Sequence, residues 1–296
     1  EQEVDWIALS FVQRPEDVAE ARKLTGNKAA LLAKIEKPAA IERLDEILEL
    51  SDAVMVARGD LGVELRPEQV PPLQKEIVSK ARKMGRPVVV ATQMLESMIK
   101  SPTPTRAEVS DVANAIYDGT DAVMLSAESA AGQYPIEAVS TMNAVAIEVE
   151  NDDIYREQVE ASRVASRRGI NDAIVAAARE IAETTDIKAI CCFTQSGTTA
   201  LLTARERPLV PIIALTPLRG TARRLCLSWG TNCFVTASVV ERFKAAVVSA
   251  ARAARSSGIA DETDQIVVTA GVPFNVPGTT NILRVAPCDE SMIYAT

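Results

Sequence analysis

The sequence predicts an α/β protein in two parts, because two stretches that alternate strand-like and helix-like segments flank a stretch with neither pattern. In the first part, short runs of β-branched and apolar residues alternate five times with amphipathic segments. The alternation resumes near residue 171, and residues 152–169 are charged and non-periodic. We therefore expect domains over residues 1–152 and 153–296, and a chain of 296 residues that is 47% hydrophobic can form a core in each.

The first part is expected to form a parallel sheet covered by helices, since a helix follows each strand. The expected strands are about 6–11, 30–36, 53–59, 88–94 and 122–128, and the expected helices about 15–24, 38–50, 73–84, 105–117 and 135–150. Pro38 and Pro135 lie near helix starts, where a missing N–H costs nothing, and Gly85 and Gly119 follow helix ends.

The second part is expected to be a compact three-layer α/β domain. Three of its expected helices begin at Asn171, Gly197 and Arg219, and a fourth spans Val239–Ser256. Its expected strands are Lys188–Phe193, Pro211–Leu215, Asn232–Val235, Gln265–Ala270 and Asn281–Val285.

Charge and hydropathy exclude two classes of partner. Residues 1–150 hold 16 Lys and Arg against 25 Asp and Glu, a net charge of −9, whereas residues 151–296 hold 16 against 15, a net charge of +1. The acidic first part argues against a nucleic-acid surface. No apolar run reaches the roughly 18 to 20 residues that span a bilayer. We therefore expect neither nucleic acid nor a membrane as partner.

Residue usage also restricts the chemistry. Histidine is absent, which excludes His-dependent triads and His-ligated zinc. The five cysteines all lie in the second part without C-x-x-C spacing, so a reducing cytoplasm is the expected location. Any catalysis must then depend on carboxylates, lysine, hydroxyl groups and a hard metal ion.

Polar residues follow apolar ones near the ends of four expected strands. Side chains alternate along a strand, so Leu32, Lys34 and Glu36 share a face, which we expect to lie inside a barrel. The same parity groups Val54 and Val56 with Arg58 and Asp60, Val88 and Val90 with Thr92, and Met124 with Ser126 and Glu128.

The carboxylates of Glu36 and Asp60 suit a Mg²⁺ ion that shares its other ligands with water and substrate. In the alternative, each forms a structural salt bridge with Lys34 or Arg58. Lys34 is placed to offset charge on a phosphoryl group or an enolate, although a strand-end lysine is also common.

Two loops offer groups that bind anions. The turn from Ala57 to Gly62 has backbone N–H groups that glycine lets a ligand approach, or it is a simple strand-to-helix turn. The loop Thr194–Thr199 opens a helix, and its hydroxyl and N–H groups form either a phosphate cradle or an N-cap, which the bare sequence favours. Thr92 ends a strand, where a buried threonine is commonplace.

Four sequence blocks resemble pyruvate kinase: Leu31–Pro38, Val54–Glu64, Val88–Ser97 and Ser101–Glu108. The resemblance runs from Val4 to about Glu150 and continues more weakly through Thr194–Thr199. It implies a partial TIM (β/α)₈ barrel that contains the last five strands, followed by a separate α/β domain. The chain begins without Met and enters a strand at once, so we expect it to be the C-terminal part of a longer protein with three more strands and a lid domain.

The resemblance also implies roles for the residues of the first part. Glu36 and Asp60 are expected to hold Mg²⁺ or Mn²⁺, Lys34 to act in catalysis and substrate binding, and Thr92 to contact substrate and relay a proton. The turn of Ala57, Arg58, Gly59 and Asp60 is expected to bind the substrate carboxylate. The ligands for K⁺ and the nucleotide lid map to the absent N-terminal part.

In the second part, the resemblance implies that a phosphorylated sugar or nucleotide effector binds Thr194, Gln195, Ser196, Gly197, Thr198 and Thr199, with help from the loop Gly271–Thr280. Animal members that a sugar bisphosphate activates have a lysine where Gln195 stands, so fructose 1,6-bisphosphate is not the expected effector. Leu125–Ser129 also departs from the family's usual Ser-Gly-Glu-Thr.

The expected function is phosphoryl transfer from phosphoenolpyruvate to ADP, giving pyruvate and ATP in the last step of glycolysis, by a cytoplasmic homotetramer. Residues 1–296 are expected to be inactive alone. One alternative is a Mg²⁺-dependent barrel lyase that acts on phosphoenolpyruvate or pyruvate. Another is a non-catalytic truncated fragment that binds effectors.

Overall fold

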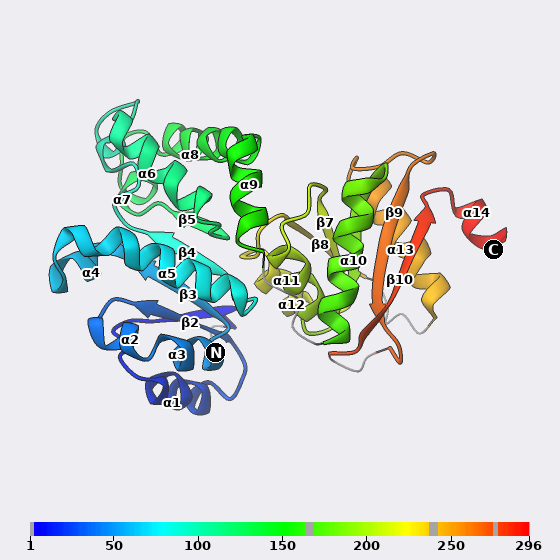
Figure 1. The fold of residues 1–296 in the computed structure, drawn as a ribbon, viewed down its shortest axis with the longest axis horizontal. Helices are drawn as coiled ribbons and strands as arrows, with labels where there is room; N and C mark the ends of the chain where they lie inside the picture. The colour runs from blue at the N-terminus through cyan, green and yellow to red at the C-terminus, as the bar shows by residue number, and fades with distance from the viewer. Residues whose placement is uncertain (1–2, 164–168, 237–241, 275–277, 296) are drawn as a thin grey trace. The chain divides into compact units, whose positions relative to one another are not determined.

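A computed structural model describes residues 3–163, 169–236, 242–274 and 278–295. The chain divides into two compact units, Glu1–Arg163 and Val164–Thr296 (Figure 1). Both alternate strands and helices, which confirms the α/β class. Within the described residues, no helix is long and apolar enough to cross a membrane.

Unit 1 contains a five-stranded parallel sheet whose strands follow chain order from one edge to the other. The strands are β1 (Trp6–Leu9), β2 (Ala30–Ile35), β3 (Ala53–Ala57), β4 (Val88–Ala91) and β5 (Ala122–Met124). The helices are α1 (Pro15–Thr25), α2 (Pro38–Glu42), α3 (Leu44–Leu50), α4 (Arg58–Glu64), α5 (Val70–Lys83), α6 (Arg106–Tyr117), α7 (Ala127–Ala130), α8 (Pro135–Glu150) and α9 (Asp153–Ala161), with 3₁₀ turns η1 (Pro67–Gln69) and η2 (Glu96–Ile99).

Local sequence signals explain many of these boundaries. Pro38 and Pro135 are the first residues of α2 and α8, as expected. Helix α6 begins with a capping box, in which Thr105 Oγ1 accepts the N–H of Glu108 at 3.3 Å and the Glu108 carboxylate accepts the N–H of Thr105 at 2.8 Å. Gly119 follows α6 with a φ of +90°, a conformation that glycine adopts readily.

Three expected elements end differently in the structure. The expected helix 38–50 is two helices, α2 and α3, which are separated at Arg43. The segment from Arg58 to Glu64 is helix α4 rather than an open turn, and β3 therefore ends at Ala57. Strand β5 ends at Met124 because Ser126 N–H donates to the Glu128 carboxylate at 2.7 Å and the chain turns into α7.

The strand register corrects the expected faces of β3 and β4. Lys34 pairs with Met55, whereas Val54 pairs with Ala33 and Val56 with Ile35. The expectation that the valines of β3 share the face of Lys34 is therefore wrong, and the same holds for Val88 and Val90. These four valines belong to the core that also contains helix residues such as Ile47, Ile77 and Val112. The parity count failed because β3 and β4 end before Arg58, Asp60 and Thr92 are reached.

The division between the units falls later than the expected boundary at 152/153, because α9 belongs to unit 1. Tyr155 and Val159 of α9 are buried in the core of unit 1. The Tyr117 hydroxyl donates to the Asp152 carboxylate at 2.8 Å, and Arg82 donates to the Ser162 hydroxyl at 2.9 Å. Packing of a short amphipathic helix against unit 1 therefore sets the boundary.

Unit 2 contains a five-stranded sheet of order β10-β9-β6-β7-β8, in which only the β9–β10 pair is antiparallel. Its strands are β6 (Ile187–Phe193), β7 (Ile212–Thr216), β8 (Thr231–Val235), β9 (Gln265–Gly271) and β10 (Thr280–Pro287). Its helices are α10 (Ile170–Thr184), α11 (Thr198–Arg205), α12 (Arg219–Leu225), α13 (Phe243–Ser256) and α14 (Glu290–Ala295). Sequence analysis missed α14, and residues 239–241 of the helix expected from Val239 lie outside the described residues.

Alternate residues of the unit 2 strands face different helices, which gives three layers. Ile190 and Cys192 of β6 pack in a core with residues of α10, α11 and α12. Ala189 and Cys191 of the same strand pack in a second core with residues of α13. Both faces of the sheet are therefore covered, as expected for a three-layer α/β domain.

A buried ion cluster joins α10 and α11 within unit 2. The guanidinium of Arg205 lies 2.8 Å from the Asp172 carboxylate and 2.9 Å from the Glu206 carboxylate, and only 4% of the Arg205 side chain is exposed. We predict that Arg205→Met lowers the free energy of unfolding by about 3–5 kcal/mol, because the buried carboxylate of Glu206 and the largely buried one of Asp172 lose this cation. Denaturant unfolding measures the loss.

Arg252→Met is the control for Arg205→Met, since Arg252 bonds Glu290 at 2.6 Å with 64% of its side chain exposed. An exposed pair contributes little, so we expect the control to change stability by less than about 1 kcal/mol. Equal losses in the two variants would contradict the buried cluster's role.

Candidate functional site

The residues predicted for catalysis lie at the carboxyl ends of three neighbouring strands of unit 1. In the parallel register, Ile35 pairs with Val56 and Ala57 pairs with Ala91, so the carboxyl ends of β2, β3 and β4 meet at one edge of the sheet. Glu36 follows β2, the segment Arg58–Asp60 follows β3, and Thr92 follows β4. The edge thus brings together the segments that contain these predicted residues, as side chains at the carboxyl ends of barrel strands commonly do in active sites.

Lys34 and Glu36 form an ion pair, which confirms that they share a face. The Lys34 Nζ atom lies 2.5 Å from Glu36 Oε1, and the Glu36 side chain is 1% exposed. Lys34 also donates to the Ser10 hydroxyl at 3.1 Å. The other carboxylate oxygen of Glu36 accepts the N–H of Phe11 at 2.7 Å. The structure therefore contains the salt bridge of the structural alternative, and a metal role for Glu36 remains a prediction.

Asp60 differs from Glu36 because its carboxylate is exposed and has no bonded partner among the described residues. It lies in the first turn of α4 and makes no hydrogen bond or ion pair with other residues in the described part of the chain. A carboxylate without a protein donor keeps its lone pairs for a ligand. The alternative in which Arg58 pairs with Asp60 is wrong, since the Arg58 guanidinium bonds Asp111 instead.

Thr92 has an unusual backbone conformation at the end of β4. Its φ is +74° and that of Gln93 is +54°, in a region that β-branched residues rarely adopt. The Thr92 hydroxyl accepts the N–H of Gly59 at 2.8 Å and donates to the Ala91 carbonyl at 2.6 Å. Backbone strain of this kind is concentrated at functional sites, so Thr92 and Gly59 become stronger candidates than the sequence alone made them.

Arg58 has protein partners rather than an open guanidinium. Its Nη2 atom donates to the Thr92 carbonyl at 2.6 Å, and its Nη1 atom lies 2.6 Å from Asp111 of α6. Only 11% of its side chain is exposed. Ala57 is buried at the end of β3 and can offer a ligand only its backbone.

Sequence reasoning assigned no role to Asp111 or Glu128. Asp111 lies on α6, whose polar residues suggest an ordinary solvated face. Glu128 is 3% exposed and accepts the backbone N–H groups of Ser126 at 2.7 Å and Leu95 at 3.3 Å. The position of Glu128 beyond a fourth strand end was visible in the sequence, but its burial was not.

The oxygen ligands of this edge fit a hard divalent cation. The described residues contain no group of three or more His, Cys, Asp or Glu side chains that could hold a metal ion alone. Mg²⁺ usually keeps several waters and binds one or two carboxylates together with substrate oxygens. Glu36 and the unpartnered Asp60 satisfy that smaller requirement.

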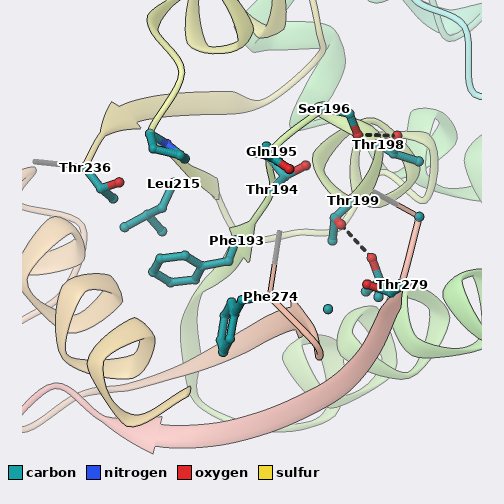
Figure 2. Close-up of a pocket in the computed structure, with 14 residues that line it drawn as sticks. Phe193, Thr194, Gln195, Ser196, Thr198, Thr199, Leu215, Thr236, Phe274 and Thr279 are labelled. Carbon is teal, nitrogen blue, oxygen red and sulfur yellow. Dashed lines mark hydrogen bonds between the residues drawn. The ribbon is translucent and has the colours of Figure 1, made fainter. Parts of the chain in front are cut away.

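A second candidate site is a pocket of unit 2 at the start of α11 (Figure 2). Its volume is about 580 Å³, part of which is open to solvent. The described residues that line it are Phe193, Thr194, Gln195, Ser196, Thr198, Thr199, Leu215, Pro217, Thr236, Gly271, Phe274, Gly278, Thr279 and Thr280. Residues 275–277 of the expected second loop lie outside the described residues. The lining is rich in hydroxyl groups, has an aromatic wall from Phe193 and Phe274, and includes no Lys or Arg among these residues.

The loop that opens α11 does not act as a side-chain cap. Gly197 is the N-cap residue with a φ of +95°, and no side chain of the described residues bonds the first turn as a cap, so the N-cap alternative is wrong. The Thr194 hydroxyl accepts the N–H of Gly197 at 2.9 Å, and the hydroxyls of Ser196 and Thr198 lie 2.9 Å apart. The hydroxyls of Thr199 and Thr280 lie 2.6 Å apart, so the two loops meet within the pocket (Figure 2).

Family models cover most of the chain. Residues 1–139 match the model "Pyruvate kinase, barrel domain", and residues 172–286 match "Pyruvate kinase, alpha/beta domain".

The relatives and a solved structure agree with these matches. A pyruvate kinase of Methylorubrum extorquens is 55% identical over 282 residues, which are 95% of this chain and 59% of that protein. One of Clostridium acetobutylicum is 43% identical over 291 residues, which are 96% of this chain and 61% of that protein. The crystal structure of a pyruvate kinase from Cryptosporidium parvum superposes with a TM-score of 0.89 at 36% identity, over 96% of this chain and 59% of that one. The chain spans about three fifths of the length of these proteins.

Proposed function

The chain belongs to the pyruvate kinase family, and from this premise we propose that its protein transfers the phosphoryl group of phosphoenolpyruvate to ADP, with pyruvate and ATP as products. The observation that carries the proposal is the sheet edge where the Lys34–Glu36 ion pair, Asp60 and the strained Thr92 lie at the carboxyl ends of adjacent strands. We also propose that β1–β5 are the last five strands of a (β/α)₈ barrel, which is supported by their parallel pairing in chain order.

We assign Mg²⁺ or Mn²⁺ to the carboxylates of Glu36 and Asp60. When bound, such an ion neutralises charge on phosphoryl oxygens and helps to orient them. Glu36 suits this role because burial fixes its carboxylate, and Asp60 because no described side chain competes for it. We assign none of the described residues to K⁺.

Lys34 supplies positive charge where negative charge develops. In phosphoryl transfer the bond between phosphorus and the enol oxygen breaks, and ADP receives the phosphoryl group. The electron pair stays on the enol oxygen, and the methylene carbon then takes up a proton to give pyruvate. The Lys34 ammonium is already held in place by Glu36 and Ser10, so it needs little reorganisation to stabilise the transferring group and the enolate.

Gly59 and Thr92 are assigned to the carboxylate and the proton of the substrate. The Gly59 N–H donates to the Thr92 hydroxyl, so a substrate carboxylate bound at the Gly59 backbone lies beside that hydroxyl. The Thr92 hydroxyl is then placed to move a proton at its oxygen. Arg58 and Ala57 shape this segment, and we assign substrate contact there to the backbone of Ala57 to Asp60.

A coupled assay of ATP formation from phosphoenolpyruvate and ADP tests the proposed function. We would assay residues 1–296 alone and an extended chain, in which they are joined to the unmatched part of the Methylorubrum extorquens relative. We expect ATP formation with the extended chain and none with residues 1–296, since positioning by the rest of the site is required. An extended chain that is folded but consumes phosphoenolpyruvate without forming ATP would favour the lyase alternative. A folded extended chain that binds effectors and consumes no substrate would favour the non-catalytic one.

We assign a regulatory role to the pocket of unit 2, with a phosphorylated sugar or nucleotide as effector. Hydroxyl and amide donors suit a phosphate, and the wall of Phe193 and Phe274 suits a sugar or base. By family membership we also assign a homotetramer and a cytoplasmic location.

Ser196→Asp is predicted to abolish effector binding, because it puts a carboxylate beside Thr198 in the proposed anion site. Isothermal titration of residues 1–296 with ribose 5-phosphate and glucose 6-phosphate measures this, and the activation lost in the extended chain should correspond to a coupling of about 1–3 kcal/mol. Fructose 1,6-bisphosphate should bind more weakly than either, since the described lining has no cation for a second phosphate.

Asn232→Asp is the control for the effector prediction, because it adds the same charge to β8 at a residue that does not line the pocket. It should leave effector binding unchanged. Unchanged binding in Ser196→Asp, or a crystal with the sugar phosphate bound elsewhere, would remove the effector role from this loop.

A further inference from the structure

The strained conformation of Thr92 requires an opposing force from its surroundings. Two consecutive residues other than glycine, Thr92 and Gln93, have positive φ values of +74° and +54°. Left-handed backbone is unfavourable for a β-branched residue and persists only where neighbouring groups hold it. The structure identifies those groups.

A single guanidinium, that of Arg58, contacts the backbone carbonyls of both strained residues. Arg58 Nη2 donates to the Thr92 carbonyl at 2.6 Å and lies 3.4 Å from the Gln93 carbonyl. Both carbonyls that the positive φ values reorient are therefore directed at one nitrogen of Arg58. Arg58 is the first residue of α4, so this contact joins the end of β3 to the end of β4.

Asp111 fixes the other end of the same guanidinium. Its Oδ1 atom lies 2.6 Å from Arg58 Nη1, and Gln74 Oε1 accepts from that nitrogen at 3.4 Å. The guanidinium group of Arg58 is planar and holds its N–H donors in fixed directions. A carboxylate bound at Nη1 therefore also sets the direction of the Nη2 donors. Asp111 lies on α6 and has no other bonded partner in the described part of the chain. Its only visible effect is thus on Arg58.

We propose that Asp111 is a positioning residue that acts through Arg58 and the Thr92 backbone to hold the Thr92 hydroxyl at the Gly59 N–H. The chain of contacts runs from Asp111 through the guanidinium to the Thr92 carbonyl, and from the Thr92 hydroxyl to Gly59 at 2.8 Å. This inference rests on the proposed function for its catalytic consequence, because Thr92 and Gly59 are the groups assigned there to the proton and the carboxylate.

The first test measures hydrogen–deuterium exchange of the Gly59 amide by NMR in residues 1–296. In Asp111→Asn the guanidinium loses its anionic partner, so the Thr92 hydroxyl should leave the Gly59 N–H and its exchange should become at least about tenfold faster. Thr92→Val removes the hydroxyl directly and should give a similar increase. The double variant should exchange no faster than Thr92→Val alone, since both changes break the same bond.

Glu108→Gln is the matched control, because it removes a carboxylate from the same helix but bonds Ser97 and Thr105 rather than Arg58. Gly59 exchange should keep its original rate in this variant. The proposal is overturned if Asp111→Asn leaves Gly59 exchange as Glu108→Gln does, or if its effect adds fully to that of Thr92→Val.

The second test separates positioning from substrate binding in the extended chain. Asp111→Asn should lower kcat about tenfold or more, because even a small displacement of a catalytic group lowers the reaction rate strongly. KM for phosphoenolpyruvate should change less than about twofold, because the variant removes no substrate contact. An unchanged kcat would overturn the catalytic part of the inference. Absence of ATP formation in the unmodified extended chain, with the expected Gly59 exchange, would instead reject the proposed function and leave the contact chain intact.

Discussion

Lys34→Met is expected to lower kcat for ATP formation in the extended chain by about 10² to 10³ or more, the loss typical of one preorganised electrostatic donor. The charge of Lys34 acts mainly on the transition state, so KM for phosphoenolpyruvate should change far less than kcat. Steady-state kinetics over a range of phosphoenolpyruvate concentrations separates the two constants. Near-normal kcat would remove Lys34 from the mechanism.

Lys34 also holds Glu36, so its loss has a structural consequence that must be measured separately. Glu36 is 1% exposed, and among the described residues Lys34→Met would leave its carboxylate with only the Phe11 N–H as partner. Lys37→Met is a suitable control, because Lys37 lies just beyond the same strand and pairs with Glu64 at 2.6 Å, away from Glu36. We expect this control to keep kcat within about twofold, since an ion pair that solvent partly reaches contributes little. If both lysine variants lost activity equally, a general effect on folding would explain the loss.

The sequence predicted those parts of the site that depend on short-range geometry. Lys34 and Glu36 are two residues apart on a strand, and the period of two was enough to place both on one face. The helix starts at Pro38 and Pro135 were also predictable from local sequence, since proline fixes φ and is tolerated in the first helical turn. The order of strand and helix segments was readable for the same reason.

The period of two failed where a strand ended earlier than expected. Counting back from Asp60 and Thr92 assigned the valines of β3 and β4 to the wrong face, because Asp60 is in a helix and Thr92 is in a left-handed turn. Helix α4 itself was hidden by Gly59 and Gly62, since glycine disfavours helix interiors. The contact of its first residue, Arg58, with Asp111 spans 53 positions in the sequence, and no local pattern indicates such a pair.

Long-range contacts also determined the boundary and the second pocket. Residues 153–161 appeared as part of a charged linker, yet Tyr155 and Val159 are buried in the core of unit 1. In unit 2, the Thr199 and Thr280 hydroxyls meet across 81 positions. Family resemblance, rather than any property of the residues themselves, had indicated that the two loops act together.

Glu36→Gln and Asp60→Asn are each expected to abolish most of the activity of the extended chain, and the double variant should lose little more. Groups that act as one unit lose most of their joint effect when the first is removed. Each amide keeps the size of its side chain while removing the negative charge that a divalent cation requires. Kinetics over a range of Mg²⁺ concentrations should show that both single variants need more metal, and titration with Mn²⁺ should show weaker binding without reference to turnover.

The two single variants should differ in their free energy of unfolding although they lose similar activity. This difference tests whether the shared loss of activity comes from the metal. Asp60 is exposed and unpartnered among the described residues, so Asp60→Asn should change the free energy of unfolding by less than about 0.5 kcal/mol. Glu36 is buried and bonded to Lys34 and Phe11, so Glu36→Gln should cost about 1–3 kcal/mol. Glu64→Gln, which removes an exposed acid paired with Lys37, is the control for loss of charge alone. Additive losses of activity with an unchanged metal requirement would show that Glu36 and Asp60 have separate structural roles.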